Sequence, residues 1–502
     1  MIASWILTAS LLLLAVSLSV WIVRVHGKRT ENAIVLALFR IIYGAVLSVE
    51  IIQMISAREM IYEFSALPPL LSSHLGFFLY AWLISAMLLA CGLCTRIAAP
   101  INYLLSVFFL KDLHKFEYHI DYIYVGVNFL LMFAPINRRW SLDSALGLEK
   151  GSDRINAVWP RLILLVGVAL VYFDSVFYKL PSIMWNSGMG VWRPATMPQG
   201  TWLDFSFLLD QHWLMLFLGY LTLVFEVVFI FAIWLDRLRL PILLIGLGLH
   251  LGITIAFPIP LFGLAVSGLY VLLLPPKAID WLDRKFSREA RKQISPYAPS
   301  PFRNGALALI LAVALFGQMM SILRDPLGDM IGRRVFSAET WNEMTHYSER
   351  LRKDFMKPVL GIVNHGVFMD DRHSNTHYLI AVARMGESGE EWLPIRRPNG
   401  QVHPLSSGRL YVYWRFRVEG RTPPSREVLE KDVASMTRHW AESSGMPLES
   451  SQFKIKVKAL TTPFDWAPGT LRAQFAVPWT DFAVLKFENN QPRIAFSDPS
   501  FM

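Results

Sequence analysis

Ten apolar stretches, each close to the length that crosses a bilayer, dominate the first two-thirds of this 502-residue chain. A helix needs roughly 20 apolar residues to span the hydrocarbon core, and lipid offers no hydrogen bonds to an irregular backbone. Pro258 and Pro260 divide one overlong stretch into two. We therefore predict a polytopic α-helical membrane bundle of about nine or ten transmembrane helices. The predicted spans are 3–23, 33–55, 77–94, 97–111, 119–136, 160–179, 213–235, 240–256, 258–275 and 304–323.

Composition agrees with a membrane protein. Hydrophobic residues make up 54 % of the chain and charged residues 17 %, whereas about a quarter of a soluble protein is charged. The net charge of +9 does not indicate a nucleic-acid partner, because Lys and Arg concentrate in alternate loops between the apolar stretches. The first stretch lacks a basic region and a cleavage site, so we predict that it stays as a helix.

The distribution of Lys and Arg also predicts an orientation. Loops such as 24–29, 138–161 and 277–303 hold most of the basic residues, and such loops face the cytoplasm. Both termini and the 180–212 loop then lie on the other side. We predict an integral protein of the bacterial inner membrane with a periplasmic, or otherwise extracytoplasmic, C-terminal domain.

After residue 325, alternating polar and apolar residues replace continuous apolarity, which indicates strands with one wet face. The sequence predicts an extra N-terminal transmembrane helix over 1–30, a membrane domain over 31–324 and a β-rich α+β domain over 325–502. In the last domain we predict strands at 376–383, 409–418, 452–459 and 473–477, a turn at 398–400 and an amphipathic helix over 424–443.

Motifs of common soluble enzymes are missing from the sequence. Cys91 and Cys94 form a single C-x-x-C with no second pair, and their predicted cytoplasmic position favours reduced thiols. Neither His119 nor His250 has a His, Cys or Asp four residues further on, so we predict no metal site. A phosphate loop, a nucleophile elbow and an H-E-x-x-H motif are also missing.

Ionisable residues within the apolar stretches cost about 2.5–3.5 kcal/mol each at the bilayer centre and should face the bundle interior or water. We predict structural roles for Arg40, Glu226 and Asp174. Gly44, one turn after Arg40, would allow another helix to approach closely. Asp174 precedes Lys179 by five residues, roughly 140° around the helix, so the two are not expected to pair.

Lys179 ends the sixth predicted span, just before Pro181. A lysine at this position is often an anchor whose charged head reaches the membrane surface. An ionisable residue that faces the protein interior is instead a functional candidate. Position alone leaves both interpretations open, although the predicted topology puts His119 on the same side of the membrane as Lys179.

Several ordered patches resemble a known family. Tyr178-Lys-Leu followed by Trp185-Asn-Ser-Gly resembles the core of the vitamin K-dependent gamma-glutamyl carboxylases, which form part of the wider HTTM (horizontally transferred transmembrane) group. His119-Ile-Asp-Tyr, closing with Arg139-Trp-Ser-Leu-Asp143, resembles that family's His-led span. The stretch from Leu36 to Gly44 is similar to its opening, and Leu249-His-Leu falls where the family has another His-containing helix. The resemblance covers about 33–280.

The resemblance implies a lyase that uses reduced vitamin K or a related quinol, such as phylloquinol or menaquinol, with O2 and CO2 as co-substrates. In that family a lysine deprotonates the quinol, and oxygen addition generates a base that removes the γ-proton of a glutamyl side chain. Carbon dioxide then captures the carbanion, and the vitamin leaves as the epoxide. By resemblance Lys179 is the base and His119 a second catalytic group. The residues expected to line the pocket are His250, Trp185, Asp121 and Tyr178.

The expected partners are the lipid bilayer, the quinol and a glutamate-containing peptide or protein at the outer face. Tyr178 stands where animal carboxylases have a second lysine, and the outer domain is much shorter than theirs. Two alternatives therefore stay open. One is a quinol-dependent oxygenase or epoxidase that does not carboxylate, and the other is a non-catalytic membrane protein whose outer domain binds a partner.

Overall fold

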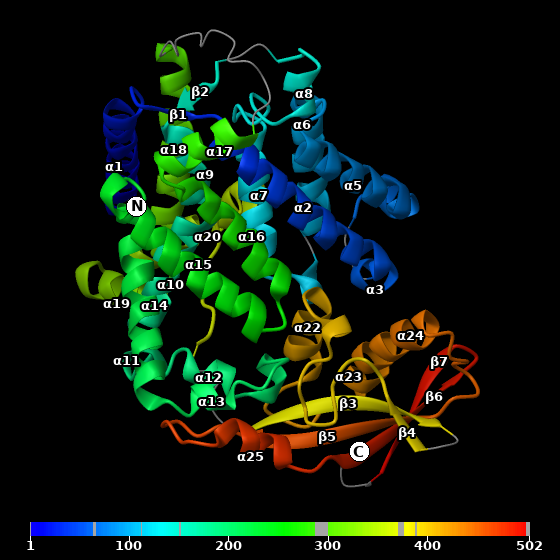
Figure 1. Cartoon of the computed structure of the whole chain (residues 1–502). Coiled ribbons are helices and arrows are strands. Elements are labelled where there is room, and N and C mark those ends of the chain that lie inside the picture. Colours follow the sequence, from blue (N-terminus) through cyan, green and yellow to red (C-terminus); the bar gives the residue numbers. More distant parts are fainter. Residues whose placement is uncertain are drawn as a thin grey trace.

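A helical bundle carries the N-terminus, and a smaller domain built on a β-sheet carries the C-terminus (Figure 1). The computed structural model describes residues 2–63, 67–111, 113–149, 152–286, 300–369, 376–386 and 389–497. The predicted architecture, a polytopic helical bundle followed by a β-rich α+β domain, is confirmed.

All ten predicted spans correspond to helices, but they differ in length. Six are long and apolar enough to cross a membrane, and three others are shorter apolar helices of 17, 16 and 12 residues. The remaining span, the ninth along the chain, begins at Pro260 as its proline predicts and joins the following helix at a bend of 96°. The six long spans are Trp5–His26, Ile34–Ser56, Val158–Lys179, His212–Ala232, Asp236–Ala256 and Pro301–Ile322.

The bundle also contains short connecting helices, and a π-helical turn at Leu165–Ala169 joins α9 to α10. The principal bundle helices are α1 (Ile2–His26), α2 (Ile34–Ser56), α5 (Leu75–Cys91), α6 (Thr95–Leu110), α7 (Ile120–Leu131), α9 (Val158–Leu164), α10 (Leu170–Lys179), α14 (His212–Ala232), α15 (Arg239–Ala256), α16 (Pro260–Tyr270), α17 (Pro276–Phe286) and α18 (Pro301–Ile322). The short helices are α3 (Arg58–Tyr62), α4 (Pro69–Ser73), α8 (Leu142–Ala145), α11 (Ile183–Asn186), α12 (Trp192–Ala195) and α13 (Ser206–Leu209), and β1 (Thr30–Asn32) pairs with β2 (Arg154–Asn156).

Residues 326–360, which the sequence assigns to the C-terminal domain, are helical and pack on the bundle. They form α19 (Pro326–Val335), α20 (Ala338–Leu351) and a π helix over Arg352–Leu360. This segment contacts α1, α7, α10 and α18. The chain therefore packs on the bundle again before it enters the sheet.

Close helix packing follows the small residues. A Cβ placed on Gly44 of α2 would lie 2.8 Å from the Cβ of Ala90 in α5, so only glycine allows this approach. Arg40, one turn earlier, is buried and donates to the backbone oxygens of Ile136 and Trp140. Both observations agree with the packing predicted for this part of α2.

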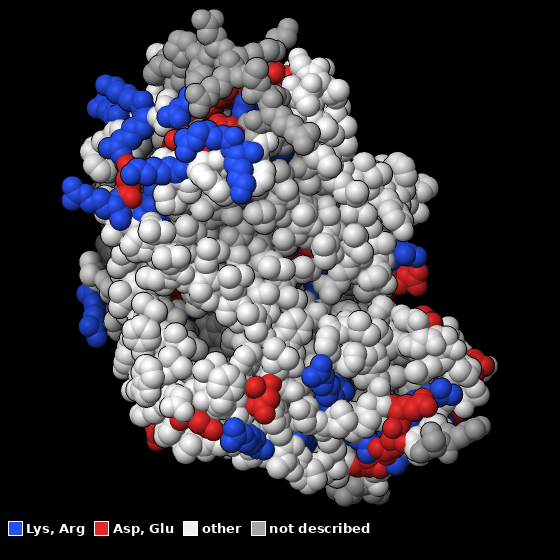
Figure 2. Space-filling model, viewed as in Figure 1, with Lys and Arg blue, Asp and Glu red and all other residues white. Residues whose placement is uncertain are grey.

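The charged residues of the bundle lie mainly at one end. Figure 2 shows Lys and Arg gathered at the end opposite the sheet, near α17, and few charged side chains across the middle of the bundle. Buried charges at the basic end are paired: Arg161 contacts Glu31 at 2.7 Å and Asp236 at 2.7 Å. A weakly charged band bounded by a basic end is typical of a membrane protein.

The C-terminal sheet has the strand order β4-β3-β5-β6-β7 and is antiparallel throughout. Residues 379–383 of β3 are completely buried, and their apolar side chains explain the position of this strand near the middle of the sheet. The strands are β3 (Thr376–Gly386), β4 (Gly389–Trp392), β5 (Phe453–Thr461), β6 (Thr480–Glu488) and β7 (Gln491–Phe496). The helices of this domain are α22 (Arg409–Tyr413), α23 (Arg426–Val428), α24 (Ala434–Ser443) and α25 (Thr470–Ala476).

Two predicted strands are wrong. Segment 409–418 is helical, as α22 followed by a π turn at Trp414–Val418, and segment 473–477 lies largely within α25. Tertiary contacts override the alternating pattern of 409–418, because Arg409 enters a buried ion-pair network and Tyr413 stacks on Phe116 with ring centroids 4.2 Å apart. The strands predicted at 376–383 and 452–459, the turn at 398–400 and the helix at 424–443 are confirmed, the last as α23, a π turn and α24.

Arg409 joins the C-terminal domain to the bundle. Its Nε lies 2.8 Å from Glu50 Oε1 in α2, and its Nη1 donates to Asp121 Oδ2 of α7 at 3.1 Å. A second contact links Arg409 Nη2 to Asp121. All three side chains are 0 % exposed, and Tyr118 Oη donates to the other Glu50 oxygen at 3.1 Å. One cation therefore holds two buried carboxylates from two bundle helices.

Candidate functional site

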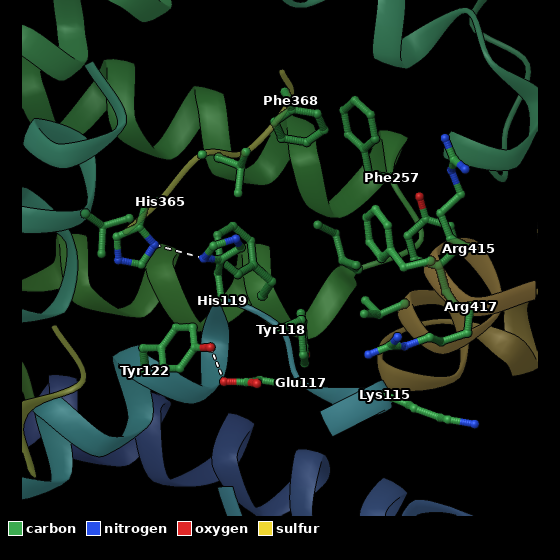
Figure 3. Close-up of a pocket in the computed structure, with 18 residues that line it drawn as sticks. Lys115, Glu117, Tyr118, His119, Tyr122, Phe257, His365, Phe368, Arg415 and Arg417 are labelled. Atoms are coloured by element: carbon green, nitrogen blue, oxygen red, sulfur yellow. Dashed lines mark hydrogen bonds between the residues drawn. The ribbon is translucent and has the colours of Figure 1, made fainter. Parts of the chain in front are cut away.

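A cavity of about 490 Å³ lies where the bundle meets the C-terminal domain (Figure 3). Four parts of the chain and one residue of α10 form its walls. These parts are the segment around the start of α7 (115–122), the turn that leads into α16 (257–262), and the later segments 365–368 and 411–417. The lining residues are Lys115, Glu117, Tyr118, His119, Tyr122, Val171, Phe257, Ile259, Phe262, His365, Gly366, Val367, Phe368, Tyr411, Val412, Arg415, Phe416 and Arg417.

Two histidines from distant parts of the sequence meet at this cavity. His119 immediately precedes α7, and His365 lies in the segment that follows the π helix of 352–360. Their Nδ1 atoms are 2.9 Å apart, as Figure 3 shows. His365 is buried, and the pKa of His365 falls well below its ordinary value because of burial and of the neighbouring His119. His365 is therefore a neutral imidazole near pH 7.

The segment that carries His365 is fixed to two bundle helices. The backbone N–H of His365 donates to Asp174 Oδ2 of α10 at 2.6 Å, and Asn364 donates to Asp325, which precedes α19. The Asp325 carboxyl acts electrostatically on Asp174, and Asp325 Oδ2 is buried without a hydrogen-bond partner among the described residues. Burial raises the pKa of Asp325 to about 7, which favours a protonated Asp325 beside Asp174.

The charges around the cavity are mostly positive. Arg415 and Arg417 line it, together with Lys115, whose Nζ lies 2.5 Å from Asp432 Oδ1, against one acid, Glu117. Glu117 is offset by Lys357, whose Nζ lies 2.7 Å from Glu117 Oε1. The cavity therefore favours a ligand with an anionic group.

Lys179 lies in a second buried cluster. Its Nζ is 2.5 Å from Glu226 Oε1 of α14 and 4.3 Å from the ring centroid of Trp185. The side chains of Lys179 and Glu226 are 3 % and 6 % exposed. Lys179 is thus an interior residue with a specific partner, and not an anchor at the membrane surface.

His250 belongs to the same region as Lys179. Its Nε2 is 2.5 Å from the Tyr172 hydroxyl, which lies 2.5 Å from the Tyr270 hydroxyl, and Lys179 is close enough to act on His250 electrostatically. Among the described residues, His250 Nδ1 has no hydrogen-bond partner. A buried imidazole nitrogen without a partner is costly unless a ligand or water binds it.

A thin apolar wall separates the two clusters. Phe262 lines the cavity and packs against His250, with ring centroids 5.8 Å apart. Phe368 also lines the cavity, and its carbonyl accepts a hydrogen bond of 2.9 Å from Trp185 Nε1. Lys179 is not among the described residues that line the cavity. The structure therefore places His119 in the cavity and Lys179 behind its wall.

The amino-acid sequence matches a known family over most of the helical bundle. Residues 28–277 match the HTTM domain. The chain belongs to the HTTM family. No curated protein and no solved structure gives a significant match.

The HTTM domain supplies one part of the site and the rest of the chain supplies the other. His119, Lys179, Glu226 and His250 all lie within residues 28–277, whereas His365 lies beyond them. The cavity is completed by residues 365–368 and 411–417. The HTTM domain by itself would therefore leave the His119 side of the cavity open.

One motif of the HTTM domain has a capping role in this structure. Asp143, which ends Arg139-Trp-Ser-Leu-Asp, accepts hydrogen bonds from the backbone N–H groups of Cys94 at 2.7 Å and Thr95 at 3.0 Å. These groups open α6, so the carboxylate stabilises a helix N-terminus. This end of the motif therefore stabilises the fold and has no role in proton transfer.

The motif after Lys179 brings α14 close. Gly188 has φ of 77°, a conformation that L side chains rarely adopt. A Cβ on Gly219 of α14 would lie 2.3 Å from the Gly188 carbonyl oxygen. This contact lets α14 approach the loop and helps to bring Glu226, two turns further along α14, to Lys179.

The other residues singled out from the sequence lie in different places. The Tyr178 ring packs against Gly366, so Tyr178 lies beside the His365 segment. Asp121 does not line the cavity; it pairs with Arg409. Asp174 does not pair with Lys179 but holds the His365 backbone, and Gln318 Nε2 donates to it at 2.7 Å.

Sequence reasoning missed His365 and the partnership of Lys179 with Glu226. His365 lies in a segment without periodicity, beyond the region of family resemblance, so no sequence signal identifies it. Glu226 carried a signal, because an acid in an apolar span needs a partner, and Lys179 is the nearest cation along the sequence that lies within a predicted span. Among the described residues no group of three or more His, Cys, Asp or Glu could hold a metal ion.

Proposed function

We propose that this HTTM protein is a membrane enzyme of the gamma-glutamyl carboxylase type, which couples oxygenation of a reduced vitamin K or related quinol to carboxylation of glutamyl side chains. The observation that supports this most directly is the juxtaposition of two buried clusters across one wall. One contains Lys179 and the other His119, the two residues that resemble the catalytic groups of that family. A protein that only binds a partner has no need of two such clusters in its membrane interior.

The Lys179 cluster fits a quinol ring. Its surroundings are apolar and aromatic, and His250 Nδ1 is an unpartnered hydrogen-bonding atom near Lys179. A base must be neutral, and Glu226 at 2.5 Å is the group that can take the proton of the Lys179 ammonium. In this proposal Lys179 removes a proton from the quinol, and His250 and Trp185 orient the ring.

The cavity fits the glutamyl side chain. Arg415 and Arg417 give it positive charge for a carboxylate, and Phe257, Phe262 and Val171 give it apolar walls. Apolar walls that exclude water would protect a strong base from being quenched. His119 lines the cavity, where it can exchange a proton with the substrate.

The decisive experiment is quinol-dependent incorporation of labelled carbon dioxide into glutamate of a test peptide by the purified protein in lipid nanodiscs. We expect incorporation that requires quinol and oxygen, and a loss of roughly 10²-fold or more in Lys179→Ala, because general-base catalysis contributes 10²–10⁴-fold. Arg493→Ala, an exposed change in the C-terminal sheet, is the matched control. A result that shows no incorporation of label and no consumption of quinol would contradict both enzyme functions.

A second function is favoured by one observation, the wall between Lys179 and the cavity. Quinol oxygenation at Lys179 could proceed without deprotonation of a glutamyl side chain in the cavity. Formation of the quinone epoxide without labelled product would select this oxygenase. Incorporation together with epoxide would exclude it.

The basic end of the bundle supports a cytoplasmic position for that end and an extracytoplasmic position for the C-terminal domain. Cys91 and Cys94 are free and exposed at the end of α5 and are the only cysteines in the sequence. In inverted bacterial membrane vesicles we expect them to react with a membrane-impermeant maleimide. In right-side-out vesicles we expect only a cysteine introduced by Ser444→Cys, on the exposed end of α24, to react. The reverse pattern would contradict the proposed orientation.

A further inference from the structure

The contact between His119 and His365 restricts what His119 can do. A neutral imidazole has one N–H and one acceptor nitrogen. Because the two Nδ1 atoms are 2.9 Å apart, one ring donates from Nδ1 and the other accepts at Nδ1. Neither Nδ1 is then available to a ligand. His119 can exchange a proton with a molecule in the cavity only at Nε2.

The charges around the pair distinguish the donor from the acceptor. Burial disfavours a positive charge on both rings, but the Glu117 carboxylate, two residues before His119, acts on the His119 ring and favours a proton there. His365 is affected by burial and by His119, both of which keep it unprotonated. The other titratable groups around the pair are Tyr122, whose ring packs against both histidines, Lys357, which pairs with Glu117, and Asp174, which accepts the backbone N–H of His365. The proton between the rings therefore belongs to His119.

We infer that His365 is a positioning residue: its Nδ1 accepts the Nδ1–H of His119, fixes that tautomer and leaves His119 Nε2 as the proton-accepting atom of the cavity. The inference rests on the proposed function and deepens it, because it assigns a direction to the first proton transfer at His119. In that step His119 Nε2 accepts one proton from an acidic group of the molecule in the cavity, which is left as its conjugate base, and His119 becomes an imidazolium. The Glu117 carboxylate and the hydrogen bond to His365 stabilise the positive charge.

The backbone contacts of His365 suit a positioning residue. Asp174 holds its N–H at 2.6 Å. Gly361, which has φ of 66°, lets the chain pass so close to α7 that a Cβ would lie 1.9 Å from the Tyr122 carbonyl oxygen. Gly366 likewise packs against the Tyr178 ring. The ring of His365 is thus held between α7, which follows His119, and α10, which carries Lys179.

The experiment measures the tautomer of His119 directly. Protein labelled with 15N only at histidine is prepared in nanodiscs, and the His119 signals are assigned by their loss in His119→Gln. We expect the wild-type protein near pH 7 to show a protonated Nδ1 and an unprotonated Nε2 at His119. His365→Phe, which has no acceptor, should show a mixture of the two tautomers. His365→Asn, whose side-chain oxygen can take the place of Nδ1, should restore the wild-type state.

Activity provides a second readout. If the quinol-dependent reaction occurs, His365→Phe should lower it by roughly 10-fold or more, and His365→Asn should recover most of the loss. A wild-type His119 with a protonated Nε2 would overturn the inference, and so would a tautomer that is unchanged in His365→Phe. The spectrum of the wild-type protein decides the inference even if a variant does not fold. The same spectrum decides the inference if no turnover is found. Failure of the inference can therefore be told apart from failure of the proposed function.

Discussion

Replacing Arg409 with methionine is expected to destabilise the protein by roughly 3–5 kcal/mol, because it removes the cation that pairs with two completely buried carboxylates. Among the described residues, Glu50 receives its charged contact from Arg409 alone, and Asp121 depends on two contacts to the same guanidinium. Tyr118 can still donate to Glu50, but a neutral donor does not neutralise two charges. The loss is measured by equilibrium unfolding in mild detergent, followed by tryptophan fluorescence.

Two further variants sharpen this test. Arg493→Met changes an exposed arginine of β7, 71 % exposed beside Glu488, and should cause no measurable loss. The triple variant Arg409→Met with Glu50→Gln and Asp121→Asn removes the uncompensated charges, and we expect it to recover more than half of the loss. A wild-type-like Arg409→Met would show that the ion pairs do not hold the domains together.

Replacing Lys179 with methionine should affect both stability and activity. The variant leaves the Glu226 carboxylate buried without its cation, and breaking a buried pair in this way costs roughly 3–5 kcal/mol. It also removes the proposed base, so quinol turnover should fall by roughly 10²–10⁴-fold. Stability is read from unfolding in detergent, and turnover from the consumption of reduced quinol.

The double variant Lys179→Met with Glu226→Leu separates the two effects. Replacement of a buried ion pair by apolar residues of similar size is often neutral or stabilising, so stability should return to that of the wild type while activity stays lost. Recovery of turnover in the double variant would rule out Lys179 as the base. Glu226→Gln alone should lower turnover as well, because it keeps the shape of the side chain but removes the proton acceptor.

Much of the fold is predictable because lipid restricts the chain so strongly. Each apolar stretch, such as 33–55 or 213–235, became a helix, since no other backbone form satisfies its hydrogen bonds in hydrocarbon. Gly44 allows the close approach of α5, and Pro260 begins α16, as their chemistry predicts. The C-terminal domain was less predictable, because local alternation competes there with tertiary contacts. In α22 the burial of Arg409 between two carboxylates outweighed the strand pattern around it.

The site was predictable only in part, for a related reason. Lys179 and His119 stood out because ionisable groups in apolar surroundings need an explanation. Their partners did not, because Glu226 is 47 residues from Lys179 and His365 is 246 residues from His119. Pairing over such distances depends on how the helices pack. Two packing features decide which residues pair: the close approach of Gly219 to Gly188, and the packing of residues 352–360 on the bundle. Neither feature follows from a local sequence pattern.

The position of Arg409 in the sequence has a consequence for biogenesis. Glu50 and Asp121 leave the ribosome long before Arg409, which follows Asp121 by 288 residues. During insertion α2 and α7 must therefore carry acidic side chains whose cation has not yet been synthesised. Charged groups enter lipid reluctantly, so these two helices stay close to water or to the insertion machinery until translation is nearly finished. The membrane-embedded part of this protein is completed only when its last third has been made and has docked.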